Sequence, residues 1–428
     1  MGTPSWGLLG PEELVSHRRR RTLGLGPVVR SFNDRAVPGL GGVWFGRQLF
    51  LATLGVAVSE QVRRQGKQVR NIDVANAIEA MACLVAYKEN GWESDPRLRG
   101  RTKLRDRSDF SFAAVRRPSF YVTQPMRRAT VQALPALGLV EADSPRFNSF
   151  RLGPAQGNTD ERTSIGMKFL DDVCRECRPH RKPVVSALGE WIQGSGKEIA
   201  TPEMCAALSP IEKLPPSACD FLLGRLAINP RRENARKWVE FVRSHPNREI
   251  SLTEQPDELD GEHWSDLCAG TRFFGSRAAA LDLLNKIEEH IASTTGRSMS
   301  AKQAKPMQEE LEALRKQSRA FLDSRYAAEP GATSFCEACS DPSDQTVLRN
   351  VVERDGRVLR LNGDDVELAP NFRGQNLGTD SAARNTEDEG AEEEAVRHLP
   401  FPEHMSPRVS NLYYLNLDLR GQLSKVLK

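Results

Sequence analysis

The sequence has no apolar run long enough to cross a membrane. Its longest apolar stretch, Leu49–Val58, has ten residues and includes Gly55, whereas a membrane-spanning helix needs about twenty. The N-terminus lacks a secretory apolar core as well, because its arginines follow its apolar residues. These absences predict a cytoplasmic protein that does not use a membrane as a partner.

Catalytic signatures are also missing. The sequence contains no HExxH, no GxSxG and no GxGxxG after a predicted strand. Gly194–Lys197 is similar to a phosphate-binding loop, but Trp191 and Glu198 stand where that motif needs Gly and Ser or Thr. Asp364–Glu367 has the acidic pattern of metal-dependent nucleases, yet Ala369 replaces the expected lysine, so a turn in a β-hairpin is the better interpretation. We therefore expect a protein without catalytic activity.

The small net charge conceals an uneven distribution. The 60 basic and 57 acidic residues give +3 overall, but residues 1–150 carry +10 and the rest of the chain carries −7. A basic first part predicts contact with a polyanion.

The densest basic segment is residues 97–107, where six cations alternate with other residues. In an extended backbone all six would project from one side about 6.6 Å apart, which suits a line of phosphates. Aromatic residues accompany further arginines up to residue 128. The sequence predicts contacts to a nucleic-acid backbone, with a solvated basic loop as the alternative interpretation. The predicted contact residues of this segment are Arg97, Arg99, Arg101, Lys103, Arg105, Arg107, Arg116 and Arg117.

A helix and a β-hairpin are predicted next. Thr123 can cap a helix that begins at Pro125, and residues 137–140 and 146–152 can form the hairpin. This order over residues 110–153 resembles the end of a winged-helix domain, although Pro135 would shorten or kink the helix. Winged helices bind DNA and also serve as protein–protein modules. The resemblance implies that Arg127, Arg128 and Gln132 lie on a recognition helix and Arg146 and Asn148 on the wing.

Eight cysteines include two CxxC pairs, Cys174/Cys177 and Cys336/Cys339. Two such pairs can supply the four thiolates that zinc prefers. Because 158 residues separate the pairs, one shared site requires the chain to fold back. We predict one structural zinc ion, with redox use or unliganded thiols in a reducing cytoplasm as the alternatives.

The predicted fold class is mainly α with small β elements. Trp44–Gly66 is expected to form a buried helix, and Asn71 to cap the helix that follows. Ala278–Ile291 and Met307–Phe321 each carry an apolar stripe, which predicts an antiparallel helical pair. Residues 346–352 and 358–361 are predicted to be strands around a turn at Asp355-Gly356. Asn411–Leu419 is expected to form a strand or helix that docks against the body or against a partner.

These elements suggest six regions. They are a flexible basic lead (1–42), a helical and winged-helix-like domain with the basic segment (43–155), a helical domain (160–328), a CxxC and β-hairpin region (329–373), an acidic disordered linker (374–398) and a C-terminal docking segment (399–428).

The sequence therefore favours a non-catalytic, DNA-binding recruiting or regulatory subunit. Its expected partners are double-stranded DNA and other protein subunits, which would bind the helical middle and the C-terminal segment. The alternatives are a scaffold subunit of a multi-component bacterial genome-maintenance or phage-defence complex and, third, a metal-dependent nuclease.

Overall fold

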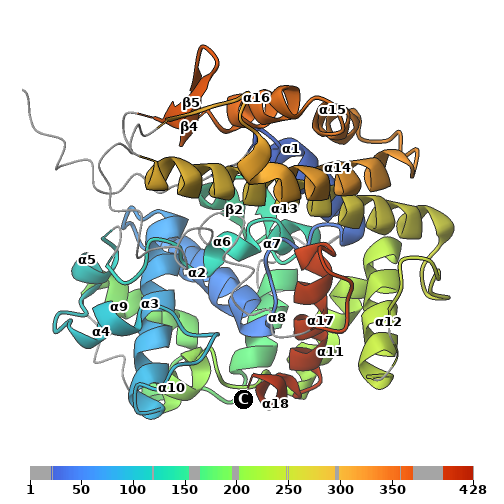
Figure 1. The fold of residues 1–428 in the computed structure, drawn as a ribbon. Helices are drawn as coiled ribbons and strands as arrows, with labels where there is room; N and C mark the ends of the chain where they lie inside the picture. Colours follow the sequence, from blue (N-terminus) through green and yellow to red (C-terminus); the bar gives the residue numbers. More distant parts are fainter. Residues whose placement is uncertain are drawn as a thin grey trace, which may run out of the picture. The chain divides into compact units, whose positions relative to one another are not determined.

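The computed structural model is mainly helical, with one two-stranded and one three-stranded antiparallel sheet among the residues that it describes (Figure 1). This confirms the predicted fold class. No helix in the described ranges is long and apolar enough to cross a bilayer. The predicted acidic linker lies outside the described residues. The structure describes residues 21, 23–117, 120–153, 164–194, 202–246, 248, 250–294, 298–356, 358–369 and 399–427.

The chain divides into two compact units. Unit 1 takes the described residues of Met1–Phe32, Ser265–Glu394 and Pro402–Ser406, and unit 2 those of Asn33–Trp264, Ala395–Phe401 and Pro407–Lys428. A boundary therefore falls inside the predicted helical domain 160–328, within the long helix α13 (Gly261–Ser293).

Unit 2 is built around two helices, α2 (Gly46–Arg64) and α3 (Asn71–Glu89), which pack side by side. The predicted buried helix at Trp44–Gly66 is thus confirmed. Gly55 allows the close approach, because a Cβ atom there would lie 2.5 Å from the Cβ of Ala75. The other elements of unit 2 are α4 (Arg101–Arg105), α5 (Phe112–Val115), α6 (Arg127–Thr130), α7 (Ala133–Ala136), β1 (Glu141–Ala142), η2 (Phe147–Ser149), β2 (Phe150–Arg151), α8 (Ile165–Cys174), η4 (Pro179–Arg181), α9 (Val184–Gln193), α10 (Pro202–Leu208), α11 (Pro216–Ala227), α12 (Pro230–Ser244), α17 (Pro407–Leu419) and α18 (Leu423–Val426).

Asn71 does not cap α3 as predicted. Arg70 holds the N-cap position without a side-chain hydrogen bond, and Asn71 is fully buried. The Asn71 amide donates instead to the backbone carbonyls of Phe147 (3.2 Å) and Phe150 (2.7 Å). It therefore joins the start of α3 to the β1–β2 hairpin.

The helix predicted from Pro125 is broken into two short ones, α6 and α7. The hairpin exists, but its first strand is β1 at Glu141–Ala142, whereas Leu139 and Val140 are buried outside any strand. The helix-then-hairpin order is present in outline, and the resemblance to a winged-helix domain stays a prediction.

The C-terminal segment docks as a helix, which confirms the prediction. Helix α17 packs against α12, α11 and α2 (Figure 1). Asp418 near its end accepts a hydrogen bond from the backbone N–H of Gly46 (2.8 Å), the first residue of α2. Helix α17 is therefore part of the core of unit 2.

Unit 1 has its own core, which includes the apolar stripes of α13 and α14 (Gln308–Leu322). The rings of Phe273 and Phe321, one on each helix, lie 6.2 Å apart. The predicted pairing of these two stripes is confirmed to the extent that they share one core. The other elements of unit 1 are β3 (Ser298–Ser300), η5 (Lys305–Met307), α15 (Pro330–Cys339), α16 (Asp344–Asp355), β4 (Leu359–Asn362) and β5 (Asp365–Leu368).

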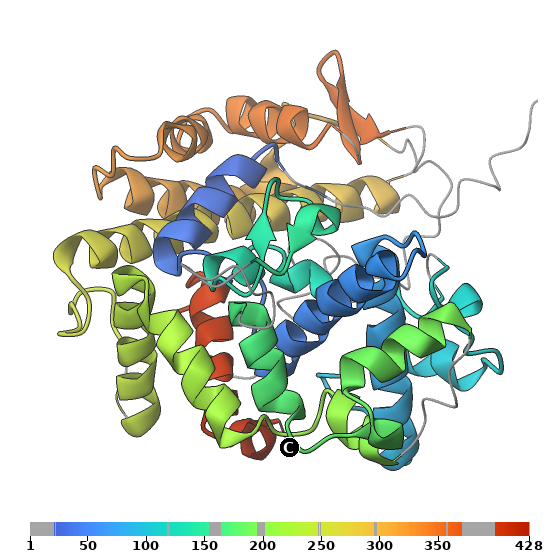
Figure 2. The same cartoon turned by 180° about the vertical axis from the view of Figure 1, so that it is seen from behind.

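Two sequence predictions are wrong in unit 1. Residues 346–352 lie in helix α16, and Gly356 ends that helix with a φ of +53° instead of turning a hairpin. The hairpin is β4–β5, in which Asn362 pairs with Asp365, so the acidic Asp364–Glu367 stretch begins in its turn as expected. Figure 2 shows this hairpin beside α16 from behind.

The predicted flexible lead also ends too late. Residues 26–36 form α1 (Gly26–Ala36), and the part of α1 within unit 1 buries Val28, Val29 and Phe32 in the core of that unit. With Leu25 these residues follow the 3.6-residue period of a helix. The Gly, Pro and Arg content around them conceals this short apolar stripe.

Candidate nucleic-acid interface

The segment with six alternating cations is not an extended strand. Gly100 has a φ of +76°, and Arg101–Arg105 form the short helix α4. A strand needs a row of apolar residues on its inner face, but only Leu98 and Leu104 supply one here, and both are buried. A helix places Arg101 and Arg105 on one side and Lys103 on the other. The predicted single line of six charges is therefore wrong.

Arg97 and Arg99 hold the segment in place instead of facing solvent. The Arg97 side chain is buried and makes two bonds to Asp95, Nε to Oδ1 (3.0 Å) and Nη2 to Oδ2 (2.7 Å). Its Nη1 also donates to the carbonyl of Ile211 (3.1 Å). Arg99 is half-buried and donates to the carbonyl of Gln124 (3.2 Å). Of the predicted contact residues, these two serve the fold.

The other six of the eight predicted contact residues in 97–117 are exposed, and we call them the basic surface. Three of them stack on aromatic rings: the Cζ atom of Arg105 lies 6.0 Å from the Trp92 ring centroid, and that of Arg107 5.0 Å from the Phe120 ring centroid. Arg116 lies 5.9 Å from Phe112 in the same way. Aromatic rings orient a guanidinium without neutralising its charge. The basic surface consists of Arg101, Lys103, Arg105, Arg107, Arg116 and Arg117.

A pocket of about 320 Å³ opens within the basic surface. Arg107 and Arg117 line it together with Phe120, and two carboxylates, Asp106 and Asp109, lie at the same place. Asp109 accepts a hydrogen bond from the backbone N–H of Ser111 (2.9 Å), and this bond lowers the pKa of its carboxyl. The pocket therefore combines cationic donors with an anionic acceptor.

Glu79 fixes residues 121–127, which follow the basic surface in the sequence, to α3. Its buried carboxylate accepts hydrogen bonds from the hydroxyl of Tyr121 and from the backbone N–H groups of Met126 (2.5 Å) and Arg127 (3.0 Å). Burial raises the pKa of Glu79, and these hydrogen bonds partly oppose that rise. A carboxylate at the start of α6 also suits the partial positive charge of a helix N-terminus.

The residues assigned to the recognition helix are largely used within unit 2. The Arg127 Nε donates to Asn76 Oδ1 (2.5 Å), and its guanidinium lies 5.4 Å from the Phe147 ring centroid. Gln132 Oε1 accepts a hydrogen bond from Arg408 (2.5 Å). Arg128 is exposed.

On the hairpin the two predicted wing residues differ. Asn148 Oδ1 accepts a hydrogen bond from the backbone N–H of Ile72 (3.0 Å), so it helps to begin α3. Arg146 is exposed. Arg128 and Arg146 are thus the residues of the winged-helix prediction that keep an exposed charge.

The two CxxC pairs belong to different units, Cys174/Cys177 to unit 2 and Cys336/Cys339 to unit 1. Within the described residues, no three or more His, Cys, Asp or Glu side chains gather as a metal site would require. Cys336 and Cys339 are fully buried in α15, whereas Cys174 and Cys177 are partly exposed. The shared zinc site stays a prediction.

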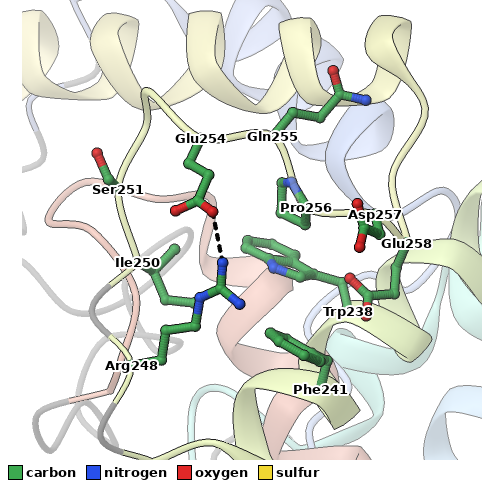
Figure 3. A pocket seen from close by; sticks show the side chains of 10 residues that line it. All are labelled: Trp238, Phe241, Arg248, Ile250, Ser251, Glu254, Gln255, Pro256, Asp257 and Glu258. Atoms are coloured by element: carbon green, nitrogen blue, oxygen red, sulfur yellow. Dashed lines mark hydrogen bonds and ion pairs between the residues drawn. The ribbon is translucent and has the colours of Figure 1, made fainter.

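A further cavity in unit 2, of about 100 Å³, lies between α12 and the loop that follows it (Figure 3). Trp238 and Phe241 form its aromatic side, and the Arg248 guanidinium lies 5.3 Å from the Phe241 ring centroid. Arg248 is paired with Glu254 at 2.7 Å. This cation and this anion already satisfy each other, so we assign the cavity no ligand.

Sequence reasoning missed Glu79, Tyr121 and the buried Arg47. The signal for Glu79 and Arg47 was a charged residue inside an otherwise apolar helical run, since a buried charge needs partners. No known protein family, curated protein or solved structure matches this chain.

Proposed function

We propose that this chain is a non-catalytic DNA-binding subunit that contacts the phosphate backbone through the basic surface. The observation that carries the proposal is the state of these cations: they are exposed, and three are held on aromatic rings. Over residues 101–117 the six cations face two carboxylates, Asp106 and Asp109. Such a surface attracts a polyanion whatever its sequence.

The contacts of the expected base readers favour a positioning role over base reading. Arg127 and Gln132, the expected base readers, are occupied within unit 2. A recruiting or regulatory subunit in the cytoplasm needs affinity for DNA more than choice among sequences.

The nuclease alternative has less support. Asp364 of the acidic stretch pairs with Lys302 (2.6 Å) and Arg349 (3.2 Å) at the turn of the β4–β5 hairpin. Both partners would compete with a metal ion for its carboxylate. Breakdown of DNA by the purified chain with Mg²⁺ would contradict the non-catalytic part of the proposal.

The test is a salt titration of duplex binding by fluorescence anisotropy. Each phosphate contact adds about 0.9 to the slope of log affinity against log salt. Changing the three stacked arginines to Gln (Arg105→Gln, Arg107→Gln and Arg116→Gln) should weaken binding to every duplex alike and flatten the slope by about 2 to 3 units.

A matched control removes the same charge from arginines that carboxylates already pair. Arg70, Arg175 and Arg248 are 67%, 69% and 50% exposed and bind Asp73, Asp172 and Glu254. The triple Gln variant of this set should keep the wild-type slope. Equal slopes of log affinity against log salt for the wild type and the stacked-arginine variant would contradict the proposal.

A further inference from the structure

The first CxxC pair sits on a turn that suits a disulfide bond. Cys174 is the last residue of α8, and the backbone N–H of Cys177 donates to the carbonyl of Cys174 (2.9 Å). In a turn closed by this bond the first and fourth Cα atoms lie less than about 7 Å apart. A disulfide joins Cα atoms about 4.4 to 6.8 Å apart. The backbone therefore already has the spacing that the bond needs.

The second pair lacks access to a reagent. Cys336 and Cys339 are 0% and 1% exposed, in a helix that belongs to the core of unit 1. The chain thus contains two pairs of the same spacing, of which one is buried and one is partly exposed.

A buried cation lies near the partly exposed pair. Arg47 donates hydrogen bonds to three backbone carbonyls, those of Ala207, Glu212 and Lys213. Burial raises the pKa values of both thiols, and the positive charge of Arg47 opposes that rise at both sulfurs. Of the two thiols, Cys177 is the less buried and is the one that a reagent reaches first.

We propose that Cys174 and Cys177 form a reversible dithiol–disulfide pair that reacts by exchange with small disulfides of the glutathione type. The Cys177 thiolate attacks one sulfur of glutathione disulfide, and one glutathione thiolate leaves. The Cys174 thiolate then attacks the Cys177 sulfur, and the second glutathione thiolate leaves. The protein pair loses two electrons and two protons, and glutathione disulfide gains them as two thiols.

The experiment uses the full chain, reduced, desalted and incubated with mixtures of glutathione disulfide and glutathione. Acid quenching, alkylation of remaining thiols and mass spectrometry of the digest then report each cysteine. The peptide that contains Cys174 and Cys177 should become two hydrogens lighter and carry no alkyl group. Dithiothreitol should reverse this change.

The buried pair is the internal control, because Cys336 and Cys339 should be alkylated in full after denaturation in every sample. The variant Cys174→Ser should accumulate a stable glutathione adduct on Cys177, since the second attack is blocked. An alkylated Cys174/Cys177 pair in the most oxidising mixture would overturn the proposal, as would an adduct on wild-type Cys177 that does not resolve. Zinc that the purified chain binds and the Cys174→Ser variant loses would overturn it too, because the thiolates would then be ligands.

Discussion

The carboxylate of Glu79 lies inside unit 2 but serves a surface segment. It accepts hydrogen bonds from the Tyr121 hydroxyl and from two backbone N–H groups at the start of α6. One side chain therefore connects residues 121–127 to α3. Burial raises the pKa of this carboxyl, because it disfavours the charged form.

The raised pKa predicts a pH-dependent stability difference. A folded pKa above the ordinary value of 4.5 means that the folded chain holds the proton more tightly than the unfolded chain. The contribution of Glu79 to stability is therefore greatest below pH 4.5 and falls as the pH rises through the folded pKa. The free energy of unfolding of the wild type minus that of Glu79→Gln should therefore decrease as the pH rises from 4.5 through the folded pKa. Urea unfolding at several pH values measures this difference.

The matched control is Glu93→Gln, which changes an exposed carboxyl. A constant difference between the wild type and Glu79→Gln at all pH values would contradict the assignment.

At the scale of elements, the contact between α2 and α3 depends on a missing side chain. A Cβ atom at Gly55 would lie 2.5 Å from the Cβ and 2.7 Å from the Cα of Ala75, and the backbone there cannot rotate away. Gly55→Ala should therefore destabilise the protein by about 1 to 3 kcal/mol through overpacking, even though Ala favours a helix over Gly by up to about 1 kcal/mol.

The matched substitution is Gly224→Ala in α11. Gly224 is exposed, and a Cβ there meets nothing within 4 Å. The helix propensity then acts alone and should stabilise the protein by about 1 kcal/mol. Thermal unfolding of both variants should give shifts of opposite sign, and a stabilising Gly55→Ala would refute the close-packing argument.

Elements with a sustained apolar stripe could be predicted from the sequence, and short ones could not. The stripes of α2, α3, α13 and α14 leave little choice of structure. In α16, Val347, Leu348, Val351 and Val352 also fit a helix face, but a strand-like alternation suggested a strand. Gly356 ends this helix instead of forming a hairpin turn. In the basic segment the charged residues alternate with the two-residue period of a strand, which led to the prediction of an extended backbone. The burial of apolar side chains, not the spacing of charges, decides the secondary structure there.

At the scale of the whole molecule, periodicity says nothing about which distant segments share a core. The C-terminal helix α17 was expected to dock, but its place against α12, α11 and α2 depends on contacts across more than one hundred residues. The same limit applies to the candidate site. Exposed charge in the basic segment could be predicted from the sequence. The ion pair between Arg97 and Asp95 and the hydrogen bond from Arg408 to Gln132, which remove Arg97 and Gln132 from the candidate site, could not.

The division of charge along the chain leads to a last prediction, which rests on the proposed DNA binding. Residues 1–150 carry +10, and six acids lie within residues 387–394. This acidic run lies outside the residues that the structure describes. We expect a tethered acidic run to reach a high effective concentration at the basic surface and to compete with DNA for it. Changing the six acids to Asn and Gln keeps the chain length and removes this competitor. Duplex affinity should then rise several-fold at low salt, and the gain should fade as salt screens both interactions.

The comparison is an anisotropy titration at low and high salt. The charge-matched control carries six Asn and Gln changes at exposed acids of unit 1, such as Glu309 and Glu312. If both variants gain affinity equally, the effect is one of net charge alone; a specific gain in the 387–394 variant identifies this run as an internal competitor for the basic surface.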